Sequence, residues 1–201
     1  RGLGDVYKRQ DKRYYAYCLL QKRFHLIMSN ITDNLELLYS ASEIKERVKA
    51  LGALISKKYD IKDPIFIGVL NGSFIFMADL LRSISIECEM DFIKVRSYSG
   101  QKSSGSIQLL KDISADVKDR DIILVEDIID TGLTIKFLRK RLFGSSPKSI
   151  AIATLLFKPS AAEIDFDIDY IGFEIPQEYV VGYGLDYEQK LRHLDGLYCI
   201  K

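Results

Sequence analysis

Three continuous apolar runs, separated by segments with helical spacing, constrain the fold of this chain most strongly. Such runs are typical of strands that are buried on both faces of a sheet, and they cover residues 65–70, 121–125 and 149–157. Apolar residues recur at helical spacing in residues 41–58, 73–83 and 132–143. Strands that alternate with helices predict an α/β fold with a mainly parallel central sheet. In such sheets, ligands bind at the carboxyl ends of the strands.

Shorter signals complete this outline. Ser40 and Glu43 form a capping-box pattern at the start of the first expected helix. Residues 90–95 and 168–173 are two further candidate strands. Residues 97–106 are polar and contain glycine, so we expect a loop there.

Composition limits the classes of protein that need to be considered. The chain has 201 residues, of which 47% are hydrophobic and 28% are charged, which predicts one globular domain. The net charge of +1 does not suggest a nucleic-acid or membrane-surface partner, and no apolar stretch reaches the ~18 residues of a membrane span. The three cysteines, Cys18, Cys88 and Cys199, are widely spaced, which argues against a disulfide framework or a zinc site. We therefore expect a reducing, cytoplasmic setting.

The first 27 residues differ in composition from the rest of the chain. They hold seven Lys or Arg and two Asp, so residues 28–201 carry a net charge of −4. This segment could be a basic arm or targeting peptide, but residues 1–10 resemble translated sequencing-adapter DNA. We expect residues 1–27 to be a leader outside the core, with Met28 as the natural start of a single domain over 28–201.

Residues 122–134 carry the strongest chemical signal. An apolar strand is expected to end on Glu126 and Asp127, and a turn containing Asp130 and Gly132 then leads into a helix. Backbone amides and hydroxyls at a helix N-terminus suit a phosphate, whereas two adjacent carboxylates suit a sugar diol or Mg²⁺. The segment therefore predicts a ribose-5-phosphate pocket.

Three other interpretations of this segment explain less of it. Asp-Thr-Gly also occurs in aspartic proteases, but those are β proteins. A phosphate-receiver domain would account for the acidic pair but not for the Thr-Gly-x-Thr turn. A plain capped helix needs neither carboxylate of the pair.

Residues 125–134 resemble the phosphoribosyl-pyrophosphate motif of the type I phosphoribosyltransferases, and the wider match is to their hypoxanthine-guanine family. Residues 68–74 resemble the pyrophosphate loop of that family, and Ser97 with the residues after it resembles its flexible loop. Lys158 and the segments 172–176 and 179–187 resemble its purine-binding part. The resemblance implies a central, mainly parallel sheet flanked by helices, with a small hood.

The resemblance also implies an activity in purine salvage. Ribose 5-phosphate would pass from phosphoribosyl pyrophosphate to N9 of a 6-oxopurine base, with Mg²⁺ required and pyrophosphate released. The products would be IMP or GMP, and the enzyme would be a homodimer or homotetramer. Another base preference, for xanthine or guanine, stays open.

Each implied role falls on a residue of this sequence. Asp130 would be the general base near N7 of the purine, with helix capping as its structural alternative. Glu126 and Asp127 would hold the ribose hydroxyls, and together with Asp186 they would hold Mg²⁺. The 5-phosphate would lie in a cradle formed by Asp130, Thr131, Gly132, Leu133 and Thr134.

The resemblance also implies which residues would bind pyrophosphate. Pyrophosphate would contact Leu70, Asn71, Gly72 and Arg192, with a cis peptide at Leu70–Asn71. Relatives often carry Lys or Arg at the position of Asn71. Without the resemblance, the Asn71-Gly72 dipeptide would suggest an ordinary turn.

The base would meet Lys158, Tyr179, Val180 and Asp186. Lys158 would donate to the 6-oxo group and so reject a 6-amino purine. Tyr179 would stack on the base, and the backbone of Val180 would contact its edge. Ser97 and Tyr98 would begin a lid over the site.

A second class of function shares part of this pattern. Regulatory proteins related to the phosphoribosyltransferases bind phosphoribosyl pyrophosphate as an effector and often lose the base-binding residues. This chain retains Lys158, Tyr179 and Asp186, and residues 28–201 have no basic excess. Both features favour the enzyme.

Overall fold

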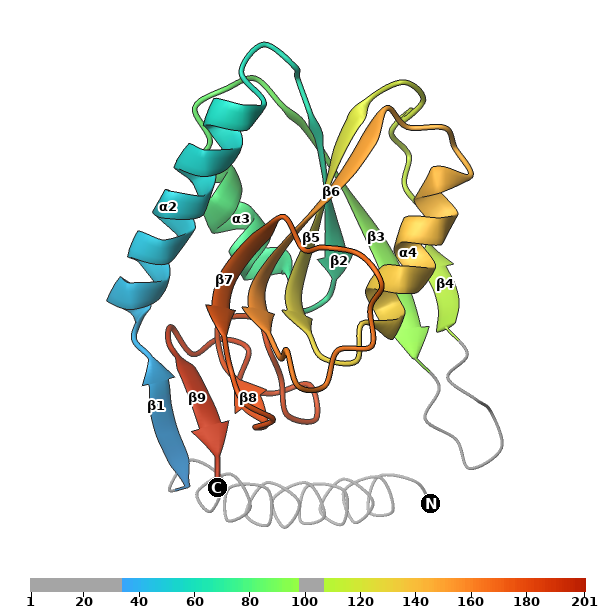
Figure 1. Cartoon of the computed structure of the whole chain (residues 1–201). Coiled ribbons are helices and arrows are strands. Elements are labelled where there is room, and N and C mark those ends of the chain that lie inside the picture. Colours follow the sequence, from blue (N-terminus) through green and yellow to red (C-terminus); the bar gives the residue numbers. More distant parts are fainter. Residues whose placement is uncertain (1–33, 98–106) are drawn as a thin grey trace, which may run out of the picture.

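The computed structural model describes residues 34–97 and 107–201. The expected leader, residues 1–27, and Tyr98 of the expected lid lie outside these residues. The described part contains two sheets and three helices, with the central sheet between helices and the smaller sheet beyond one of its ends (Figure 1). This arrangement confirms the α/β fold with a small hood.

The central sheet has six strands in the order β4-β3-β2-β5-β6-β7. Their bounds are β2 Ile65–Leu70, β3 Glu89–Ser97, β4 Ile107–Lys111, β5 Asp121–Ile129, β6 Ser149–Phe157 and β7 Tyr170–Glu174. All neighbouring strands are parallel except β3 and β4, which form an antiparallel pair at one edge. The carboxyl ends of the parallel strands β2, β5, β6 and β7 therefore lie together at one end of the sheet, and a ligand site is expected there.

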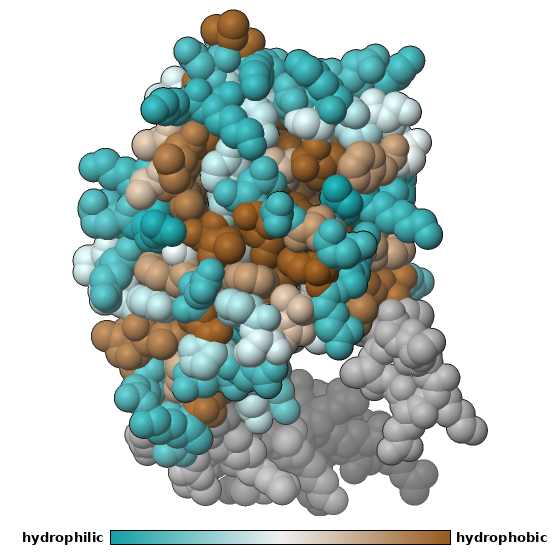
Figure 2. Space-filling model, viewed as in Figure 1, coloured by the Kyte–Doolittle hydropathy of each residue, from teal (hydrophilic) through white to brown (hydrophobic). Residues whose placement is uncertain are grey.

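Helices cover the two faces of this sheet. They are α2 (Ala41–Lys58), α3 (Phe74–Ser83) and α4 (Leu133–Phe143). Side chains alternate along β5, so Ile123 packs with α2 and α3 whereas Ile122 packs with α4. Figure 2 shows apolar side chains gathered between α2 and α4, with hydrophilic side chains around them. At the start of α2, Ser40 and Glu43 form the predicted capping box.

The hood is an antiparallel sheet in the order β1-β9-β8. It joins β1 (Leu35–Tyr39) with β9 (Leu197–Ile200) and β8 (Val180–Val181), so the two ends of the described chain lie side by side. Figure 1 places this sheet beyond the carboxyl ends of the central strands. The hood therefore brings the C-terminal segment next to the expected site.

Several expected boundaries need correction. β5 continues through Glu126 and Asp127 to Ile129, so the strand does not end on the acidic pair but two residues after it. Ser97 ends β3 instead of opening a loop, and β7 begins at Tyr170. The strands β1, β4, β8 and β9 were not predicted. None of the described helices has the length and apolar character needed to span a membrane.

Candidate functional site at the carboxyl ends of the strands

The acidic pair lies near the end of β5 and is removed from water to different degrees. Glu126 is 7% exposed, and its Oε2 has no hydrogen-bond partner among the described residues. Burial, reinforced by the negative charge of Asp127, raises the pKa of Glu126 well above its usual value. A buried carboxyl oxygen without a partner is costly, so this site is suited to a ligand hydroxyl or a cation.

Asp127 lies directly beside the loop that follows β2. A Cβ added to Gly72 would stand 1.5 Å from Asp127 Oδ2, so Gly72 leaves space for the carboxylate. The peptide between Leu70 and Asn71 is cis, as the resemblance implied. Because β2 and β5 are parallel neighbours, the loop and the acidic pair meet at the same end of the sheet.

The turn between β5 and α4 has the features of the predicted phosphate cradle. Gly132 is the N-cap of α4 with a φ of 81°, and a Cβ on it would lie 2.2 Å from Ile164 Cγ2. Gly132 has no side chain to cap the helix, and the Leu133 amide donates to Thr131 Oγ1 at 3.5 Å. The amides that follow Leu133 in the first turn of α4 are thus available to an anion. The capping alternative for Asp130 is wrong, since Gly132 occupies that position.

Asp130 instead forms an ion pair with Lys158, which follows β6. Lys158 Nζ lies 2.8 Å from Asp130 Oδ2, and the Lys158 side chain is 11% exposed whereas that of Asp130 is 51% exposed. The Lys158 amide also donates to the Ile129 carbonyl at 3.0 Å, which fixes the end of β6 against β5. The pair presents a donor and an acceptor side by side.

This pair lines a cavity of about 220 Å³ between the central sheet and the hood. The lining residues are Asp127, Ile128, Asp130, Lys158, Tyr179, Val180, Leu185 and Asp186. The structure therefore brings together all four residues expected to meet the base, with the expected general base and one carboxylate of the acidic pair. Ile128 and Leu185 were not predicted, because plain apolar side chains carry no motif signal.

Tyr179 and Val180 form the hood side of the cavity. Tyr179 is 55% exposed, and its ring lies at 79° to the Tyr187 ring, with centroids 5.9 Å apart. Its hydroxyl donates to the Asp186 carbonyl at 3.2 Å, and its own carbonyl accepts from the Ile200 amide of β9. Because Tyr179 is more than half exposed and lines the cavity, its ring is available for stacking on a flat ligand.

Arg192 and Asp186 form a second ion pair beside this cavity. Arg192 Nη2 lies 2.6 Å from Asp186 Oδ1, and Arg192 Nη1 donates to the Gly184 carbonyl at 2.7 Å. A Cβ on Gly184 would lie 2.2 Å from the Gly72 carbonyl oxygen, so Arg192 is hydrogen-bonded to a segment that touches the loop after β2. Sequence reasoning did not predict this pairing.

The expected metal set is only partly assembled. Among the described residues, no three His, Cys, Asp or Glu side chains are grouped as a metal site. Asp127 and Asp186 line the same cavity, but Asp186 also accepts from the Gln189 amide and pairs with Arg192. Mg²⁺ commonly takes one or two carboxylates and completes its shell with water and substrate phosphates. Asp127 and Asp186 fit that pattern, whereas a three-carboxylate site with Glu126 does not form.

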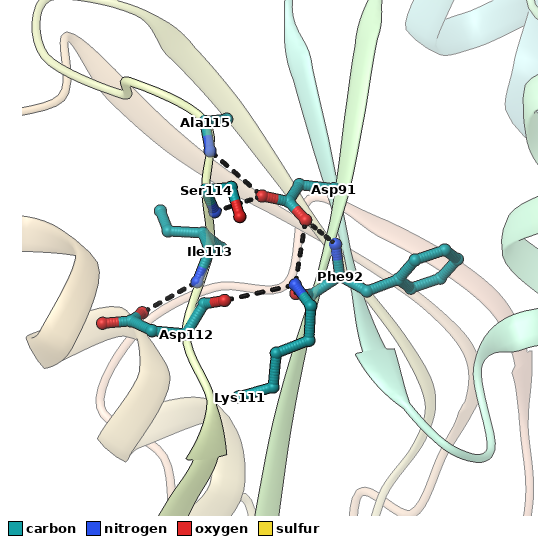
Figure 3. Close-up of polar contacts among 7 residues, drawn as sticks. All are labelled: Asp91, Phe92, Lys111, Asp112, Ile113, Ser114 and Ala115. Carbon is teal, nitrogen blue, oxygen red and sulfur yellow. Dashed lines mark hydrogen bonds and ion pairs between the residues drawn. The ribbon is translucent and has the colours of Figure 1, made fainter.

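A network around Asp91 connects the start of β3 to the segment that follows β4 (Figure 3). Its carboxylate, on β3, accepts from the Phe92 amide at 2.6 Å and from the Ala115 amide at 3.0 Å, beyond β4. The Lys111 ammonium lies 3.1 Å from it. Burial alone raises the pKa of Asp91, but these donors and the Ser114 amide together lower it to about 2. This structural carboxylate was not predicted.

Comparisons with known proteins agree with this geometry. Residues 35–188 match the family model described as the phosphoribosyl transferase domain. The chain is 44% identical to a hypoxanthine phosphoribosyltransferase of Escherichia coli over 162 residues, 79% of this chain and 91% of that protein. It is 44% identical to a hypoxanthine-guanine phosphoribosyltransferase of Bacillus subtilis over 167 residues, 83% of this chain and 93% of that protein.

Solved structures show the same similarity. A crystal structure of a hypoxanthine-guanine phosphoribosyltransferase from Bacillus anthracis superposes with a TM-score of 0.79 at 40% identity. The match covers 83% of this chain and 98% of that one.

Proposed function

The chain belongs to the phosphoribosyl transferase family, and we propose that it transfers ribose 5-phosphate from phosphoribosyl pyrophosphate to N9 of hypoxanthine or guanine. The Asp130–Lys158 pair inside the cavity carries this proposal. In a 6-oxopurine, N7 and O6 stand on the same edge of the base. The Lys158 ammonium would donate to O6 while the Asp130 carboxylate accepts the proton carried by N7. One ion pair would thus both select the base and accept the proton of N7.

In the proposed reaction, the bond between N9 and C1′ of the ribose forms as the bond between C1′ and pyrophosphate breaks. The electron pair of the broken bond leaves with pyrophosphate, and the purine proton passes toward Asp130. Glu126 and Asp127 hold the ribose hydroxyls, and the amides of residues 131–134 hold the 5-phosphate. Leu70, Asn71, Gly72 and Arg192 bind the departing pyrophosphate.

We assign Mg²⁺ as the cofactor on the oxygen donors of Asp127 and Asp186. When bound, Mg²⁺ would neutralise charge that develops on pyrophosphate. Ser97, at the end of β3, and Tyr98 would begin a lid that keeps water from the reacting sugar.

We also infer a cytoplasmic enzyme that assembles as a homodimer or homotetramer. The two cysteines of the described residues, Cys88 and Cys199, are free thiols, which supports a reducing compartment. Light scattering after size exclusion tests the assembly, with a monomer as the contrary result.

A direct assay tests the proposed reaction. The full chain is given phosphoribosyl pyrophosphate and Mg²⁺ with hypoxanthine, guanine, xanthine or adenine in separate reactions. We expect nucleotide from hypoxanthine and guanine but not from adenine. Asp130→Asn should lower kcat by about 10²–10⁴-fold, whereas the exposed Asp60→Asn should not. Tight binding of phosphoribosyl pyrophosphate without product from any base would instead indicate the regulatory class of function.

A further inference from the structure

Tyr183 and Asp79 connect the C-terminal segment to the helix that follows the pyrophosphate loop. The Tyr183 hydroxyl donates to Asp79 Oδ2 at 2.6 Å. Tyr183 is 6% exposed, and burial together with the Asp79 carboxylate raises the pKa of its phenol, so the hydroxyl keeps its proton. Hydrogen bonds to charged groups are among the stronger ones in proteins. This contact therefore ties the two elements together firmly.

Asp79 is rigidly connected to the pyrophosphate loop. It lies in α3, about one and a half turns from the helix start, and α3 begins two residues after Gly72. Ser73, between loop and helix, is fully buried and its hydroxyl donates to the Val69 carbonyl at 2.6 Å. A displacement of Asp79 along the helix axis would thus move the loop as well.

Tyr183 is connected to Arg192 just as directly. Its amide donates to the Leu194 carbonyl at 2.8 Å, and the next amide, of Gly184, donates to the Arg192 carbonyl at 3.0 Å. The Arg192 guanidinium in turn donates to the Gly184 carbonyl. Gly184 itself rests on the Gly72 carbonyl. The segment that Tyr183 anchors therefore carries Arg192 on one side and touches the pyrophosphate loop on the other.

We propose that Tyr183 and Asp79 are positioning residues that fix Arg192 and the 183–186 segment relative to the Asn71–Gly72 loop. Neither side chain lines the cavity that holds the Asp130–Lys158 pair. Both instead line a separate cavity of about 840 Å³ between α2, α3 and the C-terminal segment. The hydrogen bond therefore acts mainly on the binding of phosphoribosyl pyrophosphate, through Arg192 and the Asn71–Gly72 loop, although Leu185 and Asp186 of the same segment also line the cavity of the Asp130–Lys158 pair. This inference rests on the proposed function, which assigns pyrophosphate to the loop and to Arg192.

The test compares the KM for phosphoribosyl pyrophosphate with the KM for the base. Tyr183→Phe removes only the hydroxyl, and we expect it to raise KM for phosphoribosyl pyrophosphate by roughly 5- to 20-fold with little change in KM for hypoxanthine. Asp79→Ala should have the same effect, and the double variant should be no worse than either single one. Asp79→Asn keeps an acceptor oxygen and should restore a KM near that of the unmodified protein.

Arg82→Gln supplies the matched control, because Arg82 forms an ion pair with Asp79 and, among the described residues, makes no hydrogen bond to Tyr183. It should leave both KM values unchanged. Calorimetric titration of phosphoribosyl pyrophosphate into each folded variant gives a second readout that needs no turnover. If Tyr183→Phe does not fold, the Asp79→Ala and Asp79→Asn pair makes the same comparison.

Two results would overturn the inference. One is a lowered Tm in Tyr183→Phe and Asp79→Ala with an unchanged affinity for phosphoribosyl pyrophosphate, which is the behaviour of a purely structural contact. The other is an equal loss of affinity for both substrates. Either result leaves the proposed function intact, since that function fails only if the unmodified protein makes no nucleotide.

Discussion

Lys158 Nζ lies 2.8 Å from Asp130 Oδ2, although 28 positions separate the two residues in the sequence. The contact exists because β5 and β6 are parallel neighbours and both residues follow the carboxyl ends of these strands. Lys158 is almost fully buried, so its charge needs this partner. The half-exposed carboxylate of Asp130 lines the cavity, which is where we propose that the edge of the base binds.

Replacing Lys158 should change base selection. Lys158→Gln puts an amide, which can both donate and accept, in place of a group that can only donate. We expect kcat/KM for hypoxanthine to fall by about 10- to 100-fold, and the ratio between hypoxanthine and adenine to narrow. Parallel assays with both bases measure this ratio, with the exposed Lys57→Gln as the control. An unchanged ratio would show that other groups select the base.

Replacing Tyr179 should weaken binding of the base and leave phosphoribosyl pyrophosphate largely unaffected. Stacking of a base on an aromatic ring contributes about 1–3 kcal/mol, so Tyr179→Ala should raise KM for hypoxanthine roughly 10-fold or more. Tyr179→Phe keeps the ring and loses only the contact to the Asp186 carbonyl, so its KM should stay within about 3-fold. Equal effects of the two substitutions would indicate that the hydroxyl, and not the ring, matters.

Local sequence patterns predicted the parts of the site that are built from contiguous residues. The acidic pair, the Gly132 turn and the start of α4 follow one another along the chain, so their spacing alone indicated a ribose-phosphate pocket. The family resemblance then supplied Lys158 and Tyr179, which the cavity does bring together with Asp130.

Long-range pairings could not be predicted in the same way. β8 has two residues and β9 has four, and each becomes a strand only because it pairs with a distant segment. The ion pair of Asp130 with Lys158 depends on such a pairing too, because it joins the ends of β5 and β6. The polar segment after β4 gave no sign that its amides would converge on Asp91.

Asp91 should make stability depend on pH in the acidic range. The pKa of Asp91 is about 2 in the folded protein and near 3.8 in the unfolded chain, so the folded state binds fewer protons between these values. Its stabilising effect is complete above pH 3.8 and is lost as the pH falls through about 2. Asp91→Asn should lower the free energy of unfolding by about 1–3 kcal/mol at pH 7, and by progressively less toward pH 2.

Urea unfolding of Asp91→Asn and the unmodified protein at a series of pH values measures this difference, and Asp60→Asn is again the control. A difference that stays constant from pH 7 to pH 2 would mean that the Asp91 network stabilises the fold without its charge.

Gly72 should be needed for the active arrangement of Asp127. In Gly72→Ala the new methyl group would stand 1.5 Å from Asp127 Oδ2, so either the carboxylate or the pyrophosphate loop has to move. Such overpacking typically costs about 1–3 kcal/mol, and here both groups that move belong to the proposed binding site. We expect kcat/KM for phosphoribosyl pyrophosphate to fall at least about 10-fold. Gly144→Ala is the matched control, because a Cβ at that position only approaches the Arg141 carbonyl at 3.3 Å. If Gly72→Ala lost stability but bound phosphoribosyl pyrophosphate normally, the close approach of loop and carboxylate would serve packing alone.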